Sequence, residues 1–152
     1  MRISRLVLAS ALTALVFASA DLCWPAPRVE AAWTTDFEAA KASAAKSGKR
    51  LLLDFTGSDW CIYCQKLDAE VLSTPDFKAF AKDYVLVYVD FPRGKQLPEA
   101  LKVQNDALRE KFSIEGYPTV IVTDASGKEI RRAVGYDPGS GPGTYLAQFA
   151  PP

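Results

Sequence analysis

The sequence contains no histidine, and this absence excludes several kinds of catalytic and metal site. A Ser-His-Asp triad, a Cys-His nucleophile and a histidine-ligated zinc site cannot form. Covalent haem attachment through Cys-x-x-Cys-His is excluded too, because Gln65 follows Cys64. An excess of either charge is also lacking, since 18 Lys and Arg balance 18 Asp and Glu. No basic surplus therefore indicates nucleic-acid binding, and net charge is not expected to steer partners.

Cysteine is scarce, with three residues in a chain of 152. A structural zinc site needs about four ligands, so it would require carboxylates or a second chain in addition to these cysteines. Two of the three, Cys61 and Cys64, form a Cys-x-x-Cys pair, and Cys23 stands apart. The pair can serve as a redox centre, as a structural disulfide or as half of a metal site, and the redox interpretation is favoured.

Residues 1–31 are predicted to be a secretory signal peptide. Arg2 and Arg5 give a positive start, and the apolar run 6–17 that follows is too short for a comfortable membrane span. The alternative is an uncleaved membrane anchor.

Two cleavage sites fit the small residues after the apolar run, one after Ala20 and one after Ala31. The later site is favoured because the folded domain is expected to start just beyond it. Cleavage after Ala20 would leave Cys23 in the mature protein, whereas cleavage after Ala31 would remove it.

Residues 32–152 are predicted to form one α/β domain, and a composition of 49% hydrophobic and 24% charged residues suits such a domain. Apolar spacing and turn residues predict a strand-helix-strand half followed by a hairpin half, so the central sheet should be mixed. The expected elements are a helix over about 36–46, a strand over 51–55, a helix from 61, a short helix around 77–80, a strand over 84–89, a helix over 97–112, hairpin strands ending at 123 and covering 129–134, and a short helix around 145–149.

The strand 51–55 leads through a short loop to the helix that opens on Cys61 and Cys64. Thiols three residues apart on the first helical turn lie on the same side and can form a disulfide without unwinding it. Free backbone N–H groups and the helix dipole favour a thiolate at Cys61. We therefore expect Cys61 to be the more exposed, nucleophilic sulfur and Cys64 to resolve the mixed disulfide.

The run Trp60-Cys61-Ile62-Tyr63-Cys64 and the run Gly116-Tyr117-Pro118-Thr119, followed by a hairpin, resemble the thioredoxin superfamily over roughly residues 34–150. The residues around Cys61 look most like secreted or periplasmic bacterial thioredoxin-like proteins of the disulfide-reductase type. The resemblance implies a thioredoxin fold, with a mixed central β-sheet flanked by helices on both faces. It also implies a cis peptide bond before Pro118; without it, a trans proline opening an edge strand would be expected.

The resemblance assigns further site residues. Asp54 falls where many members carry a buried acid under the cysteine pair. A raised pKa would let Asp54 accept and return the proton of Cys64, whereas the simpler alternative is a hydrogen-bonded acid at a strand end. The remaining candidates should form a partly apolar rim for docking substrate: Trp60, Ile62, Tyr63, Tyr117, Pro118 and Gly135.

Three departures from the family pattern concern the direction of electron flow and the choice of partner. The segment 92–112 is longer than the corresponding segment of most family members. The position that often carries a lysine near the buried acid is apolar, at Leu86. The pair between the cysteines is Ile62-Tyr63 and adds no positive charge. A histidine there would stabilise the thiolate and make an oxidant, so its absence favours the reducing half of the family's range.

These features predict an exported thiol–disulfide oxidoreductase, favoured as a reductase. The alternatives are a disulfide-forming oxidant and a redox-inert binding module of the same fold. The expected redox group is the Cys61–Cys64 disulfide itself, with no other cofactor and no metal. Expected partners are proteins or peptides with disulfides or thiols and a membrane or periplasmic protein that restores the active redox state; nucleic acid is not expected. The expected location is periplasmic or secreted, in a bacterium.

Overall fold

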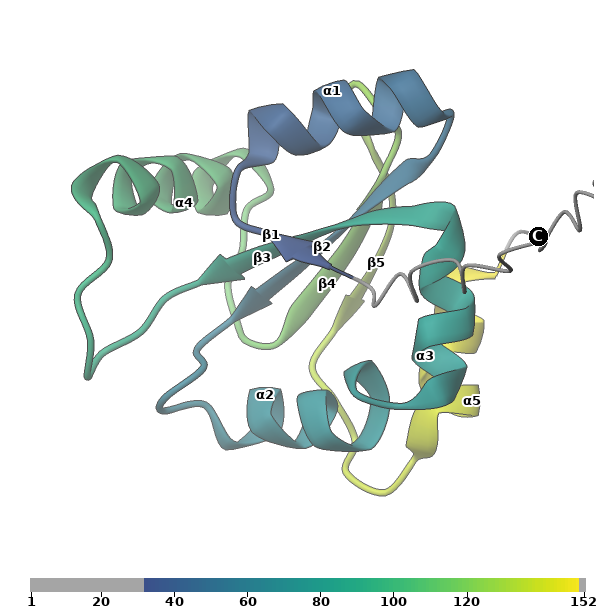
Figure 1. Cartoon of the computed structure of the whole chain (residues 1–152). Coiled ribbons are helices and arrows are strands. Elements are labelled where there is room, and N and C mark those ends of the chain that lie inside the picture. The colour runs from purple at the N-terminus through teal and green to yellow at the C-terminus, as the bar shows by residue number, and fades with distance from the viewer. Residues whose placement is uncertain (1–31, 151–152) are drawn as a thin grey trace, which may run out of the picture.

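The computed structural model describes residues 32–150, in which a five-stranded sheet lies between two groups of helices (Figure 1). The predicted signal peptide, both of its cleavage sites and Cys23 lie outside the described residues. Within residues 32–150, no helix is both long and apolar enough to cross a membrane.

The strands and helices follow one another nearly as expected from the sequence. In chain order they are β1 (Trp33–Thr34), α1 (Phe37–Ser47), β2 (Arg50–Thr56), α2 (Ile62–Leu67), the π-helical turn η1 (Asp68–Leu72), α3 (Pro75–Phe80), the 3-10 turn η2 (Ala81–Asp83), β3 (Tyr84–Asp90), α4 (Glu99–Lys111), β4 (Thr119–Thr123), β5 (Glu129–Val134), α5 (Gly141–Leu146) and the 3-10 turn η3 (Ala147–Phe149).

The sheet has the order β1-β3-β2-β4-β5 and is mixed, as predicted. β1, β3 and β2 run parallel, whereas β4 is antiparallel to both β2 and β5. β2 is thus paired on both edges and, from Leu51 to Thr56, buried on both faces. The strand β1 was not predicted, because two residues are too short to show an alternating pattern.

Two helix boundaries illustrate how local residues set these elements. α1 begins after Asp36, whose carboxylate accepts the Ala39 N–H at 2.9 Å, and it ends at Gly48 in the left-handed region (φ 69°). The expected start of the later helix at Leu97 is wrong, since α4 begins at Glu99. Pro98 disfavours helical backbone in the residue before it, which moves the start past the proline.

Each face of the sheet has its own hydrophobic core, and helices cover both (Figure 1). α1 and α4 pack on the face that carries Leu51, Leu53 and Phe55. The opposite face carries Leu52 and is covered by α2, η1, α3 and α5. Because side chains alternate along a strand, Asp54 lies on the same face as Leu52, beneath the helix that holds the cysteines.

Candidate active site

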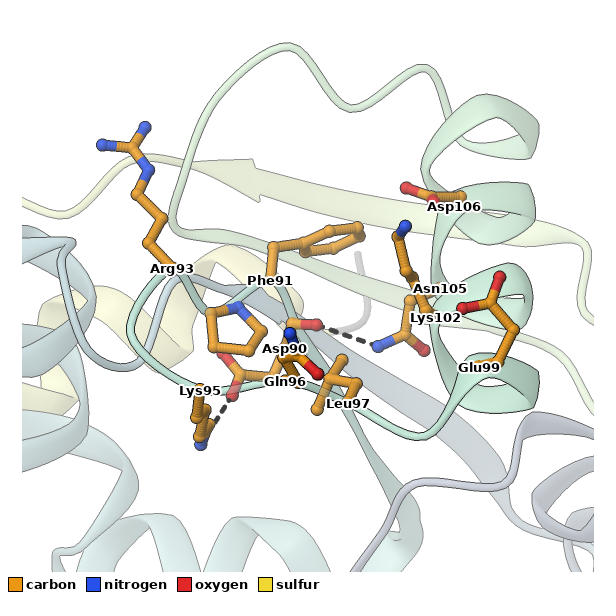
Figure 2. Close-up of a pocket in the computed structure, with 11 residues that line it drawn as sticks. Asp90, Phe91, Arg93, Lys95, Gln96, Leu97, Glu99, Lys102, Asn105 and Asp106 are labelled. Carbon is orange, nitrogen blue, oxygen red and sulfur yellow. Dashed lines mark hydrogen bonds and ion pairs between the residues drawn. The ribbon is translucent and has the colours of Figure 1, made fainter.

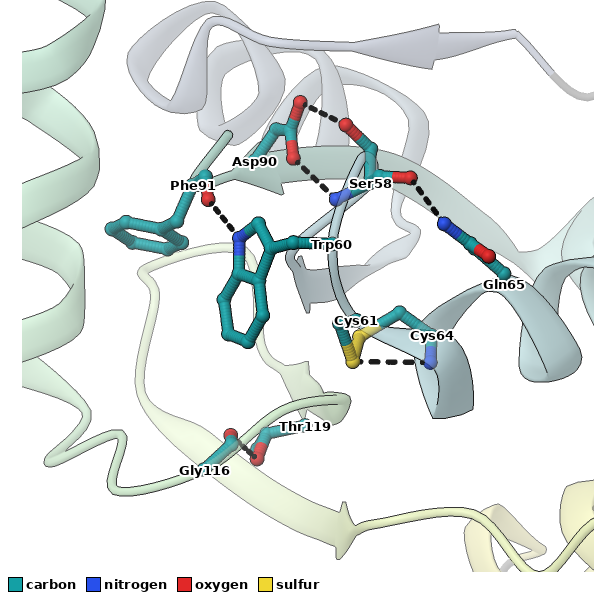
Figure 3. The surroundings of a disulfide bond; sticks show 9 residues. All are labelled: Ser58, Trp60, Cys61, Cys64, Gln65, Asp90, Phe91, Gly116 and Thr119. Atoms are coloured by element: carbon teal, nitrogen blue, oxygen red, sulfur yellow. Dashed lines mark hydrogen bonds between the residues drawn. A yellow bond between two sulfur atoms is a disulfide. The ribbon is translucent and has the colours of Figure 1, made fainter. Parts of the chain in front are cut away.

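Cys61 and Cys64 form a disulfide at the start of α2, with their Cα atoms 5.3 Å apart (Figure 3). Cys61 is the N-cap residue of the helix, and its Sγ accepts the backbone N–H of Cys64 at 3.2 Å. The predicted pair therefore stands at the predicted helix start, with a backbone donor aimed at the first sulfur. A donor in this position favours a negative charge on that sulfur after reduction.

Cys61 is the more exposed of the two cysteines, as expected, but only marginally, and both are buried in this disulfide form. Cys61 is 6% exposed and Cys64 4%, so the difference between them is small. The exposed positions next to the disulfide belong instead to Ile62 and Tyr63, at 59% and 53%.

The loop before Cys61 is a tight turn that depends on Gly57. The Gly57 carbonyl accepts the backbone N–H groups of Cys61 at 2.8 Å and Trp60 at 3.2 Å. A Cβ on Gly57 would overlap the indole ring of Trp60, so no larger residue fits without moving that ring. The turn thereby fixes both Trp60 and the N-cap sulfur.

Residues 91–98, which we call the connector, follow β3, and together with Asp90 at the end of β3 they are tied to this loop at three points. Buried Asp90, just before the connector, accepts from the backbone N–H of Ser58 at 3.0 Å and from its hydroxyl at 2.7 Å (Figure 3). The Asp59 carboxylate accepts the backbone N–H groups of Arg93 and Gly94, the latter at 2.7 Å. These two N–H groups hold the pKa of Asp59 below its usual value.

The third tie runs through Trp60, whose indole N–H donates to the Phe91 carbonyl at 2.8 Å (Figure 3). The indole meets the Tyr117 ring edge to face at 5.7 Å, and the Arg93 guanidinium lies 3.7 Å from the indole centroid. Phe91 packs on Tyr117 at 5.3 Å. The sequence singled out Trp60 and Tyr117, but it did not show that the connector closes this side of the site.

The Tyr117–Pro118 peptide bond is cis, as the resemblance implied. The Pro118 carbonyl accepts the N–H of Gly135 at 2.8 Å, which joins two candidates that stand far apart in the sequence. Gly135 has a φ of 77°, which favours glycine. Val134 beside it is 65% exposed and adds an apolar surface that the sequence analysis did not identify.

Asp54 is buried in the middle of the sheet, 3% exposed. Burial, helped by the negative charges of Asp68 and Asp90, raises its pKa from 3.8 to about 7. Its Oδ1 has no hydrogen-bond partner among residues 32–150. Leu86, buried on the same face, supplies no cation. Asp54 therefore changes protonation near neutral pH.

A cavity of about 470 Å³ lies between the connector and α4 (Figure 2). Asn105, buried in α4, donates to the Asp90 carbonyl at 2.9 Å, and Lys95 pairs with the Asp90 carboxylate at 3.0 Å. None of the site residues expected from the sequence lines this cavity. The cavity and the site around Cys61 share one wall, which the connector forms.

Comparison with known proteins places this geometry among related chains. Residues 32–125 match a family model described as thioredoxin-like. The chain is 36% identical over 110 residues to the disulfide bond reductase DsbH of Chlamydia pneumoniae, an alignment that covers 72% of this chain and 65% of DsbH. It is 32% identical over 120 residues to the thioredoxin-related protein DsbJ of the same organism, covering 77% of this chain and 34% of DsbJ. The chain thus spans less than two thirds of the length of either relative.

Solved structures of similar proteins superpose on this chain. A DsbH oxidoreductase superposes with a TM-score of 0.70 at 32% identity, covering 85% of this chain and 90% of that one. The oxidised C-terminal domain of DsbD from Neisseria meningitidis superposes with a TM-score of 0.56 at 22% identity, covering 78% and 97%. The second likeness concerns the fold alone.

Proposed function

Because the chain belongs to the thioredoxin-like family, we propose that it is a thiol–disulfide oxidoreductase that acts through Cys61 and Cys64. The observation that carries the proposal is the position of the pair. Cys61 caps α2 with its sulfur on the Cys64 N–H, and a buried carboxyl that titrates near pH 7 lies on the sheet face beneath.

In the reducing direction the reaction proceeds in two exchanges. The Cys61 thiolate attacks one sulfur of a substrate disulfide, forming a mixed disulfide and releasing the other sulfur as a thiolate. Cys64 then gives its proton to Asp54 and attacks the Cys61 sulfur. The bond between Cys61 and the substrate breaks, the second substrate thiolate leaves, and both thiolates take up protons. Two electrons pass from the protein dithiol, which becomes the Cys61–Cys64 disulfide, to the substrate.

The rim of the site is proposed to hold an extended substrate segment. Ile62, Tyr63 and Val134 are exposed apolar side chains close in sequence to the disulfide or to Gly135. Trp60 and Tyr117 form an aromatic wall, and Pro118 lacks an N–H that could compete with the substrate backbone. Gly135 is anchored to Pro118 and completes the rim.

We favour a reductase over an oxidant. The relative DsbH is named a disulfide bond reductase, and Ile62-Tyr63 adds no positive charge that would stabilise the dithiolate. Equilibration with reduced and oxidised glutathione distinguishes the two. A potential near that of thioredoxin, about −270 mV, supports the reductase, and one near about −120 mV supports the oxidant.

Export to the periplasm or beyond is part of the proposal and rests on the signal-like segment 1–31 and on bacterial relatives. A reductase outside the cytosol needs a membrane or periplasmic donor, because the glutathione and thioredoxin pools are cytosolic. The proposed substrates are proteins or peptides that carry disulfides.

Trapping of covalent intermediates tests the activity. Cys64→Ser should accumulate mixed disulfides on Cys61 when the reduced protein meets a disulfide peptide, because the resolving thiol is gone. Cys61→Ser is the matched control and should accumulate none. Mass spectrometry under non-reducing conditions measures both. If neither variant nor the wild type forms a covalent adduct, the chain is a binding module and the proposal is wrong.

A further inference from the structure

A buried tyrosine lies on the same face of the sheet as Asp54. Tyr145 in α5 is 3% exposed and belongs to the core cluster that includes Leu52 and Val120. Leu52 precedes Asp54 by two residues on β2, and Val120 on β4 is the pairing partner of Asp54. The negative charge of Asp54 contributes to raising the pKa of Tyr145, after burial as the larger cause, so the two groups are within electrostatic reach.

Both groups have a polar atom without a partner. Within residues 32–150, the buried side-chain atoms that lack any hydrogen bond are Asp54 Oδ1 and the Tyr145 hydroxyl. Buried polar groups in proteins are nearly always paired with protein or with ordered water, and a buried water commonly joins such groups. A donor and an acceptor left without partners on the same side of the sheet therefore complement each other.

Other groups that face Asp54 are poor donors to it. Asp68 on η1 and Asp90 on β3 carry negative charge. Tyr88 on β3 is half-buried and its hydroxyl contacts Ser58. Cys64 on α2 is the proton donor of the proposed reaction rather than a fixed partner. The remaining donor is Tyr145.

We infer that the Tyr145 hydroxyl donates a hydrogen bond to Asp54 through one bridging water molecule, and so sets the proton affinity of that carboxylate. Tyr145 is then a positioning residue for the proton transfer between Asp54 and Cys64, an inference that rests on the proposed function. A hydrogen bond to the ionised form stabilises it, so Tyr145 keeps the pKa of Asp54 lower than burial alone would leave it. Without this donor, Asp54 would stay protonated, and useless as a base, to a higher pH.

The first test needs no catalysis. The ¹³C resonance of the Asp54 carboxyl is followed against pH in the oxidised protein, where the midpoint is expected at or somewhat below about 7, because burial and the Asp68 and Asp90 charges alone raise the pKa to about 7. Tyr145→Phe should raise the midpoint by about one pH unit, since one such unit is about 1.4 kcal/mol and matches the loss of one hydrogen bond to a charge. Tyr136→Phe is the matched control, because the Tyr136 hydroxyl donates to Glu70 instead, and it should leave the midpoint unchanged.

An unchanged midpoint in Tyr145→Phe, or an equal shift in Tyr136→Phe, overturns the inference. A second measurement uses the unaltered protein, so that it does not depend on the folding of a variant. The Tyr145 ring carbon that bears the hydroxyl should change its resonance with the same midpoint as Asp54. The absence of that inflection also overturns the inference.

The kinetic test measures how fast Cys64 releases a thiol from a mixed disulfide on Cys61 at different pH values. One pH unit below the wild-type midpoint, Tyr145→Phe should be slower by about tenfold, and well above both midpoints the two rates should agree. Asp54→Asn should remove the inflection in both backgrounds, so that Tyr145→Phe adds nothing to it. A wild type that never resolves a mixed disulfide refutes the proposed function, whereas a working wild type with an unshifted Tyr145→Phe profile refutes only the role of Tyr145.

Discussion

Replacing Asp54 with asparagine should remove a pH-dependent loss of stability from the oxidised protein. Burial, with the nearby charges of Asp68 and Asp90, raises the pKa of Asp54 from 3.8 to about 7, so the folded state holds a proton that the unfolded state has already released between these values. Unfolding therefore becomes easier as the pH rises through this window, and the stability is fully present only below the unfolded pKa. Asparagine has nearly the same shape and does not titrate.

The magnitude follows from the size of the shift. A difference of about three pH units at 1.36 kcal/mol each amounts to about 4 kcal/mol across the whole window. About two of these units lie between pH 5 and pH 7, so the wild type should lose about 3 kcal/mol of unfolding free energy between pH 5 and pH 8. Asp59, Glu70 and Asp124 have lowered pKa values and act below this range.

Urea unfolding of the disulfide form at pH 5 and pH 8 measures the effect, since neither Cys61 nor Cys64 then titrates. With a typical slope of about 1–3 kcal/mol per molar urea, the wild-type midpoint should fall by about 1–3 M and that of Asp54→Asn should stay nearly level. Asp137→Asn, an exposed carboxyl in the loop after β5, is the control and should follow the wild type. Parallel pH dependence in wild type and Asp54→Asn would refute the claim that this carboxyl is buried at a cost.

Two further predictions concern the loops around the site. Gly57→Ala should lower the unfolding free energy by about 1–3 kcal/mol, because the added methyl overlaps the Trp60 indole. Gly116→Ala is the control and should have little effect, because a methyl there meets open space. Thermal unfolding measures both variants, and equal losses of stability would contradict the steric explanation. Glu70→Ala removes the carboxylate that accepts the Tyr136 hydroxyl and the Gly139 N–H, both at 2.7 Å, so hydrogen exchange at Gly139 should become faster; protection as strong as in the wild type would show that the loop does not depend on Glu70.

Local patterns were sufficient to predict most of the architecture. The apolar run before Gly57 gave the central strand, the residues flanking α1 gave both of its ends, and the β4–β5 hairpin followed from its turn. The cysteine pair at a helix start was predictable for the same reason, since both of its determinants lie within a few residues. The cis bond before Pro118 came from the family resemblance and not from the local pattern.

The features that could not be predicted depend on contacts between distant segments. β1 exists only because Trp33 and Thr34 pair with β3. The connector closes the site through hydrogen bonds that join residues more than thirty positions apart, and no local signal marks Asp59 or Asp90 as their acceptors. The low exposure of Cys61 depends on the residues that surround it in the fold, which the helix-start position alone does not specify.

The ties between the two loops also limit how this protein can diverge from its relatives. Asp59 and Asp90 each accept hydrogen bonds from the opposite segment, and the Trp60 indole donates the third. A connector of another length or backbone path would no longer bring the Arg93 and Gly94 N–H groups to Asp59 or the Phe91 carbonyl to the Trp60 indole. The two loops therefore form one structural unit. To exchange substrate preference between relatives, both loops should have to be replaced together.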